Sequence, residues 1–178
     1  MSRVDPTAPV GELISSLCAT IPDYPKPGIV FKDLTPVFAD GAALQAVVKP
    51  LVEPFKGEFD AVAGVEARGF LLAAAAAYAT GTGVITVRKA GKLPREVVSE
   101  DYALEYGNAT LELHTTDLAP GSRVLILDDV LATGGTLAAG RRLIEARGAE
   151  VVGAACLLEL TALGGRAVVP DTHVLFAS

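Results

Sequence analysis

Short apolar runs alternate with longer segments of helical pattern from residue 60 to the end of the chain. FLLAAAAAYA (70–79) and GTLAAGRRLIEARG (135–148) have the length and composition of helices. The apolar runs between and around them are DAVAGV (60–65), GVITVR (83–88), RVLILDD (123–129), EVVGAACLLEL (150–160) and THVLFA (172–177). Strands that are apolar along their whole length are buried on both faces, as in a parallel sheet covered by helices. The pattern therefore predicts an α/β fold with an open, mostly parallel sheet flanked by helices.

The bulk composition fits one folded domain spanning residues 1–178. The formal net charge of −6 disfavours nucleic acid as a partner, because proteins that bind it usually carry a basic face. The most apolar run, 70–79, is too short to cross a membrane, which takes about 20 residues. Cys18 and Cys156 are too few for a disulfide framework or a zinc site. We therefore expect a protein of the reduced cytoplasm without nucleic-acid or membrane partners.

Residues 1–40 have a different pattern and are interpreted as an N-terminal helix followed by a hood. Apolar residues fall at helical spacing between Glu12 and Ile21. The prolines at 22, 25, 27 and 36 then exclude a long helix or a central strand. Asp40 has the position of an N-cap for the next helix, whose apolar stripe runs from Leu44 to Phe55.

The stretch VLILDDVLATGGT (124–136) is the strongest candidate for a binding site. Asp128 and Asp129 follow an apolar strand, and open α/β sheets bind ligands at the carboxyl ends of their strands. The small residues after them allow backbone N–H groups to approach a ligand, and they lead into a helix whose N-terminus is partly positive. This arrangement suits a phosphate, while the carboxylates suit sugar hydroxyls or the waters of a magnesium ion. A phosphorylated sugar satisfies both requirements.

The alternative interpretation of this stretch is a tight turn in which Asp129 caps the following helix. Two neighbouring acids at a strand end favour the ligand site instead. Other phosphate-binding motifs fit less well, because the chain has no G-x-x-x-x-G-K-[ST] sequence and Gly81-Thr82-Gly83 lacks the third glycine of a dinucleotide fingerprint.

The stretch resembles the signature of the type I phosphoribosyltransferases, and its DD…ATGGT form is similar to the adenine branch of that family. Four further segments match the adenine branch in the same order: PDYPKPGIVFKDLTP, AGVEARGF, RKAGKLPRE and LEYG. The segment LLELTALGGR also fits, so the resemblance covers nearly the whole chain. It implies the type I phosphoribosyltransferase fold with a small N-terminal hood.

The resemblance also implies roles for the small-residue loop and the two strand-end loops. In the family, Asp128 and Asp129 hold the ribose hydroxyls of 5-phospho-α-D-ribose 1-diphosphate (PRPP). Its 5-phosphate binds at Ala132, Thr133, Gly134, Gly135 and Thr136. Arg68, in a loop that often contains an unusual cis peptide, binds the diphosphate. From position alone, Arg68 could equally cap a helix or pair with Glu66.

Residues 89–108 form a long polar connection, which the resemblance identifies as a flexible catalytic loop. Closure has a chemical purpose, because water would hydrolyse an activated ribosyl donor. Lys92 and Arg95 could bring positive charge to the diphosphate. Glu105, in LEYG, is implied to be the catalytic acid/base that takes the purine proton. A solvated hairpin with self-paired charges is the alternative.

The hood is implied to close over adenine. Val30 offers a backbone edge, Phe31 an aromatic face, and Leu160 an aliphatic contact on the other side of the base. The family often has Arg where this chain has Lys32, and Lys cannot form the planar fork of Arg. A hydrophobic strap over the core is the alternative interpretation of this segment. Neither histidine is assigned a role.

Taken together, the resemblance implies an enzyme of purine salvage that converts adenine and PRPP into AMP and diphosphate. Mg²⁺ is expected to be held by PRPP and waters rather than by protein ligands, since it keeps much of its hydration. A homodimer is expected from the family. Two rivals stay open: specificity for another purine such as guanine or xanthine, and a regulator that binds PRPP without catalysis.

Overall fold

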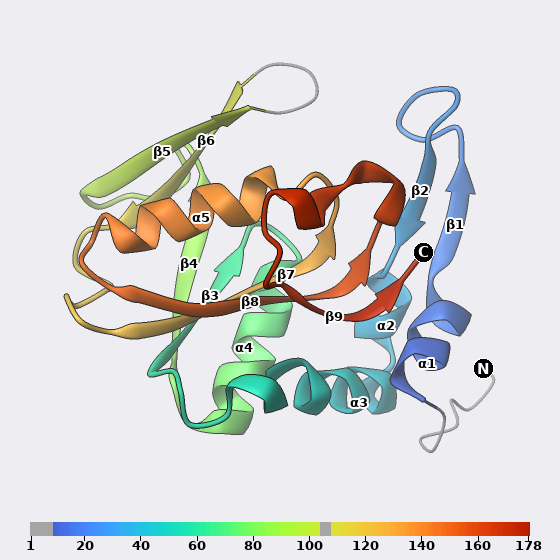
Figure 1. Cartoon of the computed structure of the whole chain (residues 1–178), viewed down its shortest axis with the longest axis horizontal. Coiled ribbons are helices and arrows are strands. Elements are labelled where there is room, and N and C mark those ends of the chain that lie inside the picture. Colours follow the sequence, from blue (N-terminus) through green and yellow to red (C-terminus); the bar gives the residue numbers. More distant parts are fainter. Residues whose placement is uncertain (1–8, 104–107) are drawn as a thin grey trace.

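A seven-stranded sheet forms the centre of the computed structural model, which describes residues 9–103 and 108–178 (Figure 1). The strand order is β5-β6-β4-β3-β7-β8-β9. The five strands from β4 to β9 are parallel, and β5 and β6 form an antiparallel edge. The strands are β3 (Ala61–Val65), β4 (Gly83–Lys89), β5 (Val97–Ala103), β6 (Asn108–His114), β7 (Arg123–Leu131), β8 (Glu150–Glu159) and β9 (His173–Ala177). The predicted open, mostly parallel sheet is confirmed.

Helices cover both faces of the sheet, as the apolar strands predict. In Figure 1, α5 (Gly135–Glu145) lies on one face, and α3 (Gly41–Val52) and α4 (Gly69–Thr80) lie on the other. Alternate residues of β7 enter different cores. Val124 and Ile126 pack on the side of α5. Leu125 and Leu127 pack on the opposite side, against α3 and α4. All four side chains are fully buried, which explains why the strand has no polar alternation.

The chain from residue 9 to residue 40 forms α1 (Val10–Leu17), β1 (Ala19–Pro22), β2 (Val30–Asp33) and α2 (Thr35–Ala39). β1 and β2 pair with each other as a separate antiparallel sheet, called the hood below. The prediction of a helix continuing to Ile21 is wrong, because Ile21 pairs with Phe31 in this ladder. Pro22 is the last residue of β1, and Pro25 and Pro27 lie between β1 and β2, which limits the length of this ladder.

The helix α3 begins where the sequence predicts, directly after Asp40. The Asp40 carboxylate accepts hydrogen bonds from the backbone N–H groups of Ala42 and Ala43, each at 2.9 Å. These bonds satisfy two of the donors that the first turn of α3 leaves free. The helix runs through Pro50 to Val52 and is followed by the 3-10 turn η1 (Glu53–Phe55).

Within the long polar connection (89–108), β5 forms a β-hairpin with β6, which begins at its end, as the alternative interpretation expected. β5 and β6 pair over their whole length, and β6 joins the sheet through β4. Tyr102, Leu111 and Leu113 are buried in the core beneath α5. That interpretation also expected the hairpin charges to pair with one another, but Glu100 pairs with Arg142 of α5. The strands of this segment are therefore a packed edge of the sheet.

Two short 3-10 turns, η2 (Thr161–Leu163) and η3 (Gly165–Ala167), follow β8 and precede β9. Residues 161–169, called the strap below, cross the end of β7. No helix in the described ranges is both long and apolar enough to cross a membrane. The run 70–79 lies within α4, as expected for a helix of the fold.

Candidate active site

Two neighbouring carboxylates, Asp128 and Asp129, lie in β7 just beyond the point where its pairing with β3 ends. Pairing with β3 ends at Leu127, whereas pairing with β8 continues to Leu131. The prediction that the acids end the strand is therefore correct on the β3 side and wrong on the β8 side, because β8 is long enough to continue the ladder. The acids stand at the carboxyl end of the central strands, where open α/β sheets bind ligands.

Burial controls the charge of these acids. Asp129 is buried and Asp128 is half-buried. The loss of water around its carboxylate, and then the charge of Asp129, raise the pKa of Asp128 well above its ordinary value. Burial also raises the pKa of Asp129, although the Arg68 guanidinium opposes this rise. Because the two groups interact, they titrate as a pair, which holds a proton more readily than isolated carboxylates do.

Oδ2 of Asp129 is a buried acceptor that receives no hydrogen bond within the described part of the chain. Nε of Arg68 lies 2.8 Å away, so the two groups form an ion pair without hydrogen-bond geometry. Oδ1 of Asp128, in contrast, accepts the backbone N–H of Asp129 at 2.9 Å. Buried acceptors are nearly always paired with a donor. Oδ2 of Asp129 is therefore suited to a hydroxyl donated by a ligand.

The small-residue loop (132–136) leads directly into the first turn of α5. Its N-cap is Gly134, at φ +82°, and no side chain accepts a capping hydrogen bond there. The interpretation of Asp129 as the N-cap is therefore wrong. The first backbone N–H groups of α5, including those of Gly135 and Thr136, stay available to an anion beside the positive end of the helix.

The strap supports this loop at close range. A Cβ at Gly134 would lie 2.7 Å from the carbonyl oxygen of Gly165 and 3.0 Å from Cβ of Val168. Real Cβ atoms do not approach other atoms this closely, so the loop and the strap fit together only because both positions are glycine.

The loop between β3 and α4 contains a cis peptide bond between Glu66 and Ala67, as the resemblance implies. Arg68 follows it at the N-cap of α4, but its side chain makes no capping hydrogen bond. Gly69 then packs against β7, because a Cβ there would lie 2.6 Å from the carbonyl oxygen of Leu127. This close packing brings the loop beside the two acids.

Arg68 pairs with acids, but not with the one in its own loop. Besides the contact with Asp129, its Nη1 lies 3.6 Å from Oδ1 of Asp33 in the hood. Its guanidinium carbon lies 5.6 Å from the centroid of the Phe31 ring. Glu66 instead accepts hydrogen bonds from Arg88 and from the backbone of Lys89. Both position-based interpretations of Arg68, a capping side chain and a Glu66 pair, are therefore wrong.

The hood carries three of the residues predicted to contact a base. Phe31 is half-buried and meets the edge of the Tyr24 ring, with centroids 5.2 Å apart. Val30 is 56% exposed. Nζ of Lys32 donates to Oγ1 of Thr20 at 3.0 Å, so this ammonium is engaged within the hood. Leu160, the fourth residue, follows β8, and its backbone N–H donates to Leu131.

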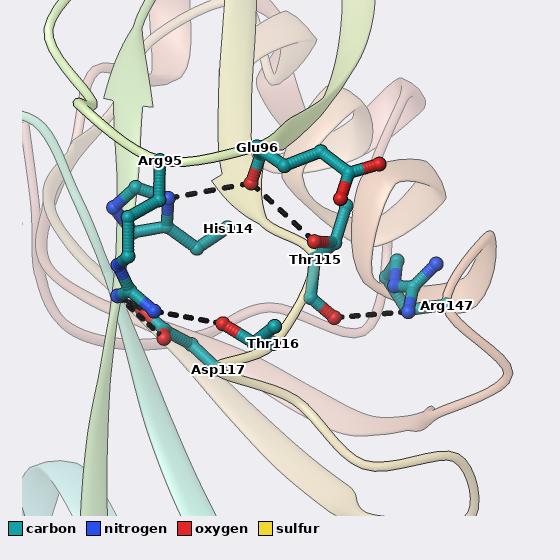
Figure 2. Close-up of polar contacts among 7 residues, drawn as sticks. All are labelled: Arg95, Glu96, His114, Thr115, Thr116, Asp117 and Arg147. Atoms are coloured by element: carbon teal, nitrogen blue, oxygen red, sulfur yellow. Dashed lines mark hydrogen bonds and ion pairs between the residues drawn. The ribbon is translucent and has the colours of Figure 1, made fainter.

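Arg95 and Lys92, the two cations expected to reach the diphosphate, differ in how they are engaged by other residues. Arg95 donates to both carboxylate oxygens of Asp117, at 2.7 and 3.0 Å, and to Oγ1 of Thr116 (Figure 2). Lys92 is exposed. The structure therefore favours Lys92 over Arg95 as a cation for an incoming anion. Glu105, the predicted acid/base residue, lies outside the described residues.

Comparison with known proteins places this geometry in a family. A family model described as the phosphoribosyl transferase domain matches residues 39–176. The chain belongs to the phosphoribosyltransferase family. Among curated proteins it is 76% identical to the adenine phosphoribosyltransferase of Arthrobacter sp. (strain FB24), over 94% of this chain and 91% of the relative. It is 72% identical to that of Renibacterium salmoninarum, over 90% of this chain and 88% of the relative. The resemblance to the adenine branch of the phosphoribosyltransferases is confirmed.

Solved structures of phosphoribosyltransferases agree in fold. The adenine phosphoribosyltransferase of Rhodothermus marinus is 45% identical, with a TM-score of 0.89, over 95% of this chain and 98% of that one. The enzyme of Giardia lamblia, solved in complex with 9-deazaadenine, is 38% identical, with a TM-score of 0.90, over 97% and 99% of the two chains. The predicted type I phosphoribosyltransferase fold is thus confirmed.

Two residues that pack against the candidate site were missed by sequence reasoning. Asp33 forms an ion pair with Arg68, which is distant from it in sequence, and Gly165 packs against the small-residue loop. The available signals were weak: an Asp two residues before Thr35, which is typical of a local turn, and the glycine pair at 164–165. Neither signal identifies its distant partner.

Proposed function

We propose that the protein transfers the phosphoribosyl group of PRPP to adenine, giving AMP and diphosphate. One observation carries the proposal: the buried oxygen Oδ2 of Asp129 receives no hydrogen bond from the described residues, and it lies near the start of α5, whose N-cap residue is a glycine without a side chain. Ribose hydroxyls and a phosphate supply what these two features need. The relatives named adenine phosphoribosyltransferase support adenine as the acceptor.

In this proposal, each loop handles one part of PRPP. Asp128 and Asp129 hold the ribose hydroxyls and stabilise the positive charge that grows at C1 as the diphosphate leaves. Backbone N–H groups from 132 to 136, with the hydroxyls of Thr133 and Thr136, hold the 5-phosphate. Arg68 and Lys92 receive the diphosphate.

The hood would hold adenine and the hairpin would exclude water. Phe31 and Leu160 contact the two faces of the base, Val30 pairs with its edge through the backbone, and Lys32 lies beside it. Attack by N9 of neutral adenine requires a proton to leave the ring, and Glu105 takes that proton. General acid/base catalysis of this kind contributes typically about 10²–10⁴ in rate.

Magnesium fits this site as an ion that arrives with the substrate. The described residues hold no cluster of three or more acidic, His or Cys side chains that would form a metal site. The two acids can accept hydrogen bonds from the waters of Mg²⁺, which prefers to keep several waters and to bind substrate phosphates. Bound in this way, Mg²⁺ would offset the charge of the departing diphosphate.

A homodimer is the proposed assembly, formed through the outer face of α4. Leu71, Ala74, Ala75 and Tyr78 share this face at helical spacing, and Leu71 and Tyr78 are 50% and 93% exposed. The helix contains no charged residue, so two copies can meet without repulsion, and the alanines permit close approach. A helix that is apolar on all sides is usually buried on all sides.

The cytoplasm is the proposed location. Both cysteines are free thiols, and Cys156 is buried in the core. Free thiols are usual in a reducing compartment such as the cytoplasm.

Product analysis tests the proposed reaction. The purified protein is incubated with PRPP and with adenine, guanine, hypoxanthine or xanthine in turn, with Mg²⁺ or with a chelator, and nucleotides are separated by chromatography. AMP should form from adenine only, and only with Mg²⁺. A nucleotide formed from another purine, but not from adenine, would contradict the specificity. PRPP binding without turnover of any base would favour the regulator.

A further inference from the structure

Arg68 lies between two acids that belong to different parts of the site. On one side is Asp129, whose Oδ2 lies 2.8 Å from Nε. On the other is Asp33, whose Oδ1 lies 3.6 Å from Nη1. The side chains of Arg68 and Asp33 keep 31% and 24% of their surface exposed, whereas that of Asp129 keeps 8%. One guanidinium therefore links the hood to the buried acid pair.

The carboxylate of Asp33 is held in place by its neighbour Thr35. The hydroxyl of Thr35 donates to Oδ2 at 2.7 Å, and its backbone N–H donates to Oδ1 at 3.0 Å. These hydrogen bonds, with a smaller effect of Arg68, lower the pKa of Asp33 below its ordinary value. Asp33 is therefore a fixed negative charge at neutral pH, set in the same strand as Phe31, over which the guanidinium also lies.

The two acids compete for one cation. An Arg68 held fully by Asp129 would neutralise the carboxylate that the ribose hydroxyls need and would direct its donors away from the diphosphate. A charge at Asp33 draws the guanidinium toward the hood and weakens that pairing. The guanidinium has five N–H donors, so a contact through Nη1 leaves others free for a second anion.

We propose that Asp33 is a positioning residue: it offers Arg68, which lies closer to Asp129 here, a second partner on the hood side, so that PRPP binding can free Asp129 for the ribose and direct Arg68 to the diphosphate. The inference rests on the proposed function, because it assigns PRPP to the space beside these residues. It adds a residue that contacts neither the base nor the ribose and acts through Arg68.

Asp33→Asn tests the role of the charge. The amide keeps the size of the side chain and an oxygen that can accept from Thr35, so the local turn is retained. We expect the dissociation constant for PRPP, measured by calorimetry, to rise about fivefold, the upper range for a partly exposed ion pair. The KM for PRPP should rise with it, while the KM for adenine changes little. Asp33→Glu should restore part of the affinity.

Thr35→Val is the matched control. It removes the hydroxyl that holds the carboxylate but keeps the charge, so a purely structural role predicts the same loss in Thr35→Val as in Asp33→Asn. Positioning through charge predicts a clearly smaller loss in Thr35→Val. Thermal unfolding of each variant checks that both remain folded.

The sign of the effect separates positioning from simple repulsion. An acid near an anion site repels the anion, so through-space repulsion alone predicts tighter PRPP binding when Asp33 becomes neutral. Unchanged or tighter binding in Asp33→Asn, or an equal loss in Thr35→Val, would overturn the inference.

The binding measurement also separates this inference from the proposed reaction. If the unmodified protein binds PRPP but forms no AMP, the reaction is wrong, and the variants still decide the role of Asp33. If the unmodified protein does not bind PRPP, both proposals fall.

Discussion

Gly134 packs so closely against Gly165 that a side chain at Gly134 would meet the backbone of Gly165, and Gly165 in turn packs against the carbonyl oxygen of Ala132 and the side chain of Leu131. A Cβ at Gly134 would lie 2.7 Å from the carbonyl oxygen of Gly165, and a Cβ at Gly165 would lie 2.7 Å from Cδ1 of Leu131. The strap thus fixes the small-residue loop from behind, at the point where the proposed 5-phosphate binds.

Gly165→Ala should move the small-residue loop and weaken PRPP use. A displacement on the order of 1 Å in a binding loop can cost up to about 100-fold in catalytic efficiency, and we expect the KM for PRPP to rise by at least about tenfold. Steady-state kinetics with each substrate varied in turn provide the measurement. Gly83→Ala is the control, because a Cβ there meets open space. A variant Gly165→Ala with an unchanged KM for PRPP would show that the strap does not position the loop.

Asp128→Asn should stabilise the ligand-free protein near neutral pH, because the neutral amide avoids the cost of a buried negative charge. The pKa of Asp128 is raised in the folded state, mainly by burial. Above the unfolded-state pKa of about 3.9, the folded state therefore binds more protons than the unfolded state, and stability falls as the pH rises toward the folded-state pKa. The advantage of the Asn variant should shrink as the pH falls toward 4. Denaturant unfolding at several pH values measures it.

Asp60→Asn provides the control of opposite sign for this pH dependence. Hydrogen bonds from Arg123 lower the pKa of Asp60, so its ionised form favours the folded state and that contribution is lost as the pH falls. An Asp128→Asn variant that is less stable than the unmodified protein at neutral pH would show that burial does not raise the pKa of Asp128.

Glu105→Gln should lower turnover about 10²-fold or more while PRPP affinity changes little. The reason is that the amide keeps the shape of the side chain but cannot take the proton that leaves adenine. Single-turnover kinetics with saturating adenine measure the chemical step, and calorimetry with PRPP measures binding. Turnover equal to that of the unmodified protein would remove Glu105 from the acid/base role.

Tyr78→Glu should convert the proposed dimer to a monomer, because it places a charge on the most exposed residue of the apolar face of α4. Sedimentation velocity over a range of protein concentrations measures the assembly. Ile29→Glu is the control, since it places the same charge on an exposed apolar residue of the hood. If Tyr78→Glu sediments like the unmodified protein, the interface lies elsewhere or the protein is not a dimer.

The central strands could be predicted because burial on both faces leaves an unbroken apolar run. Val124–Leu127 is such a run, and the acids that follow it mark the strand end on the β3 side. The hairpin was harder to predict because β5 and β6 are edge strands. Tyr102 and Leu111 face the core under α5, while the residues between buried positions are polar and make the segment look like a loop.

Contacts between distant segments were beyond sequence reasoning. Arg68 was expected at the diphosphate, but its pairing with Asp33 and Asp129 depends on how the hood packs beside β7. Gly165 likewise shows its importance only when the strap folds back over the small-residue loop. Local patterns indicate which residues can do chemistry, while the fold decides which of them meet.

The separate ladder of the hood has a mechanical consequence. β1 and β2 bond to each other and not to the seven-stranded sheet, so a change in the tilt of the hood would break no backbone hydrogen bond of that sheet. The entry of a planar molecule beneath Phe31 would then require only the exchange of side-chain contacts, such as those with Arg68, while the scaffold that carries the two acids stays rigid.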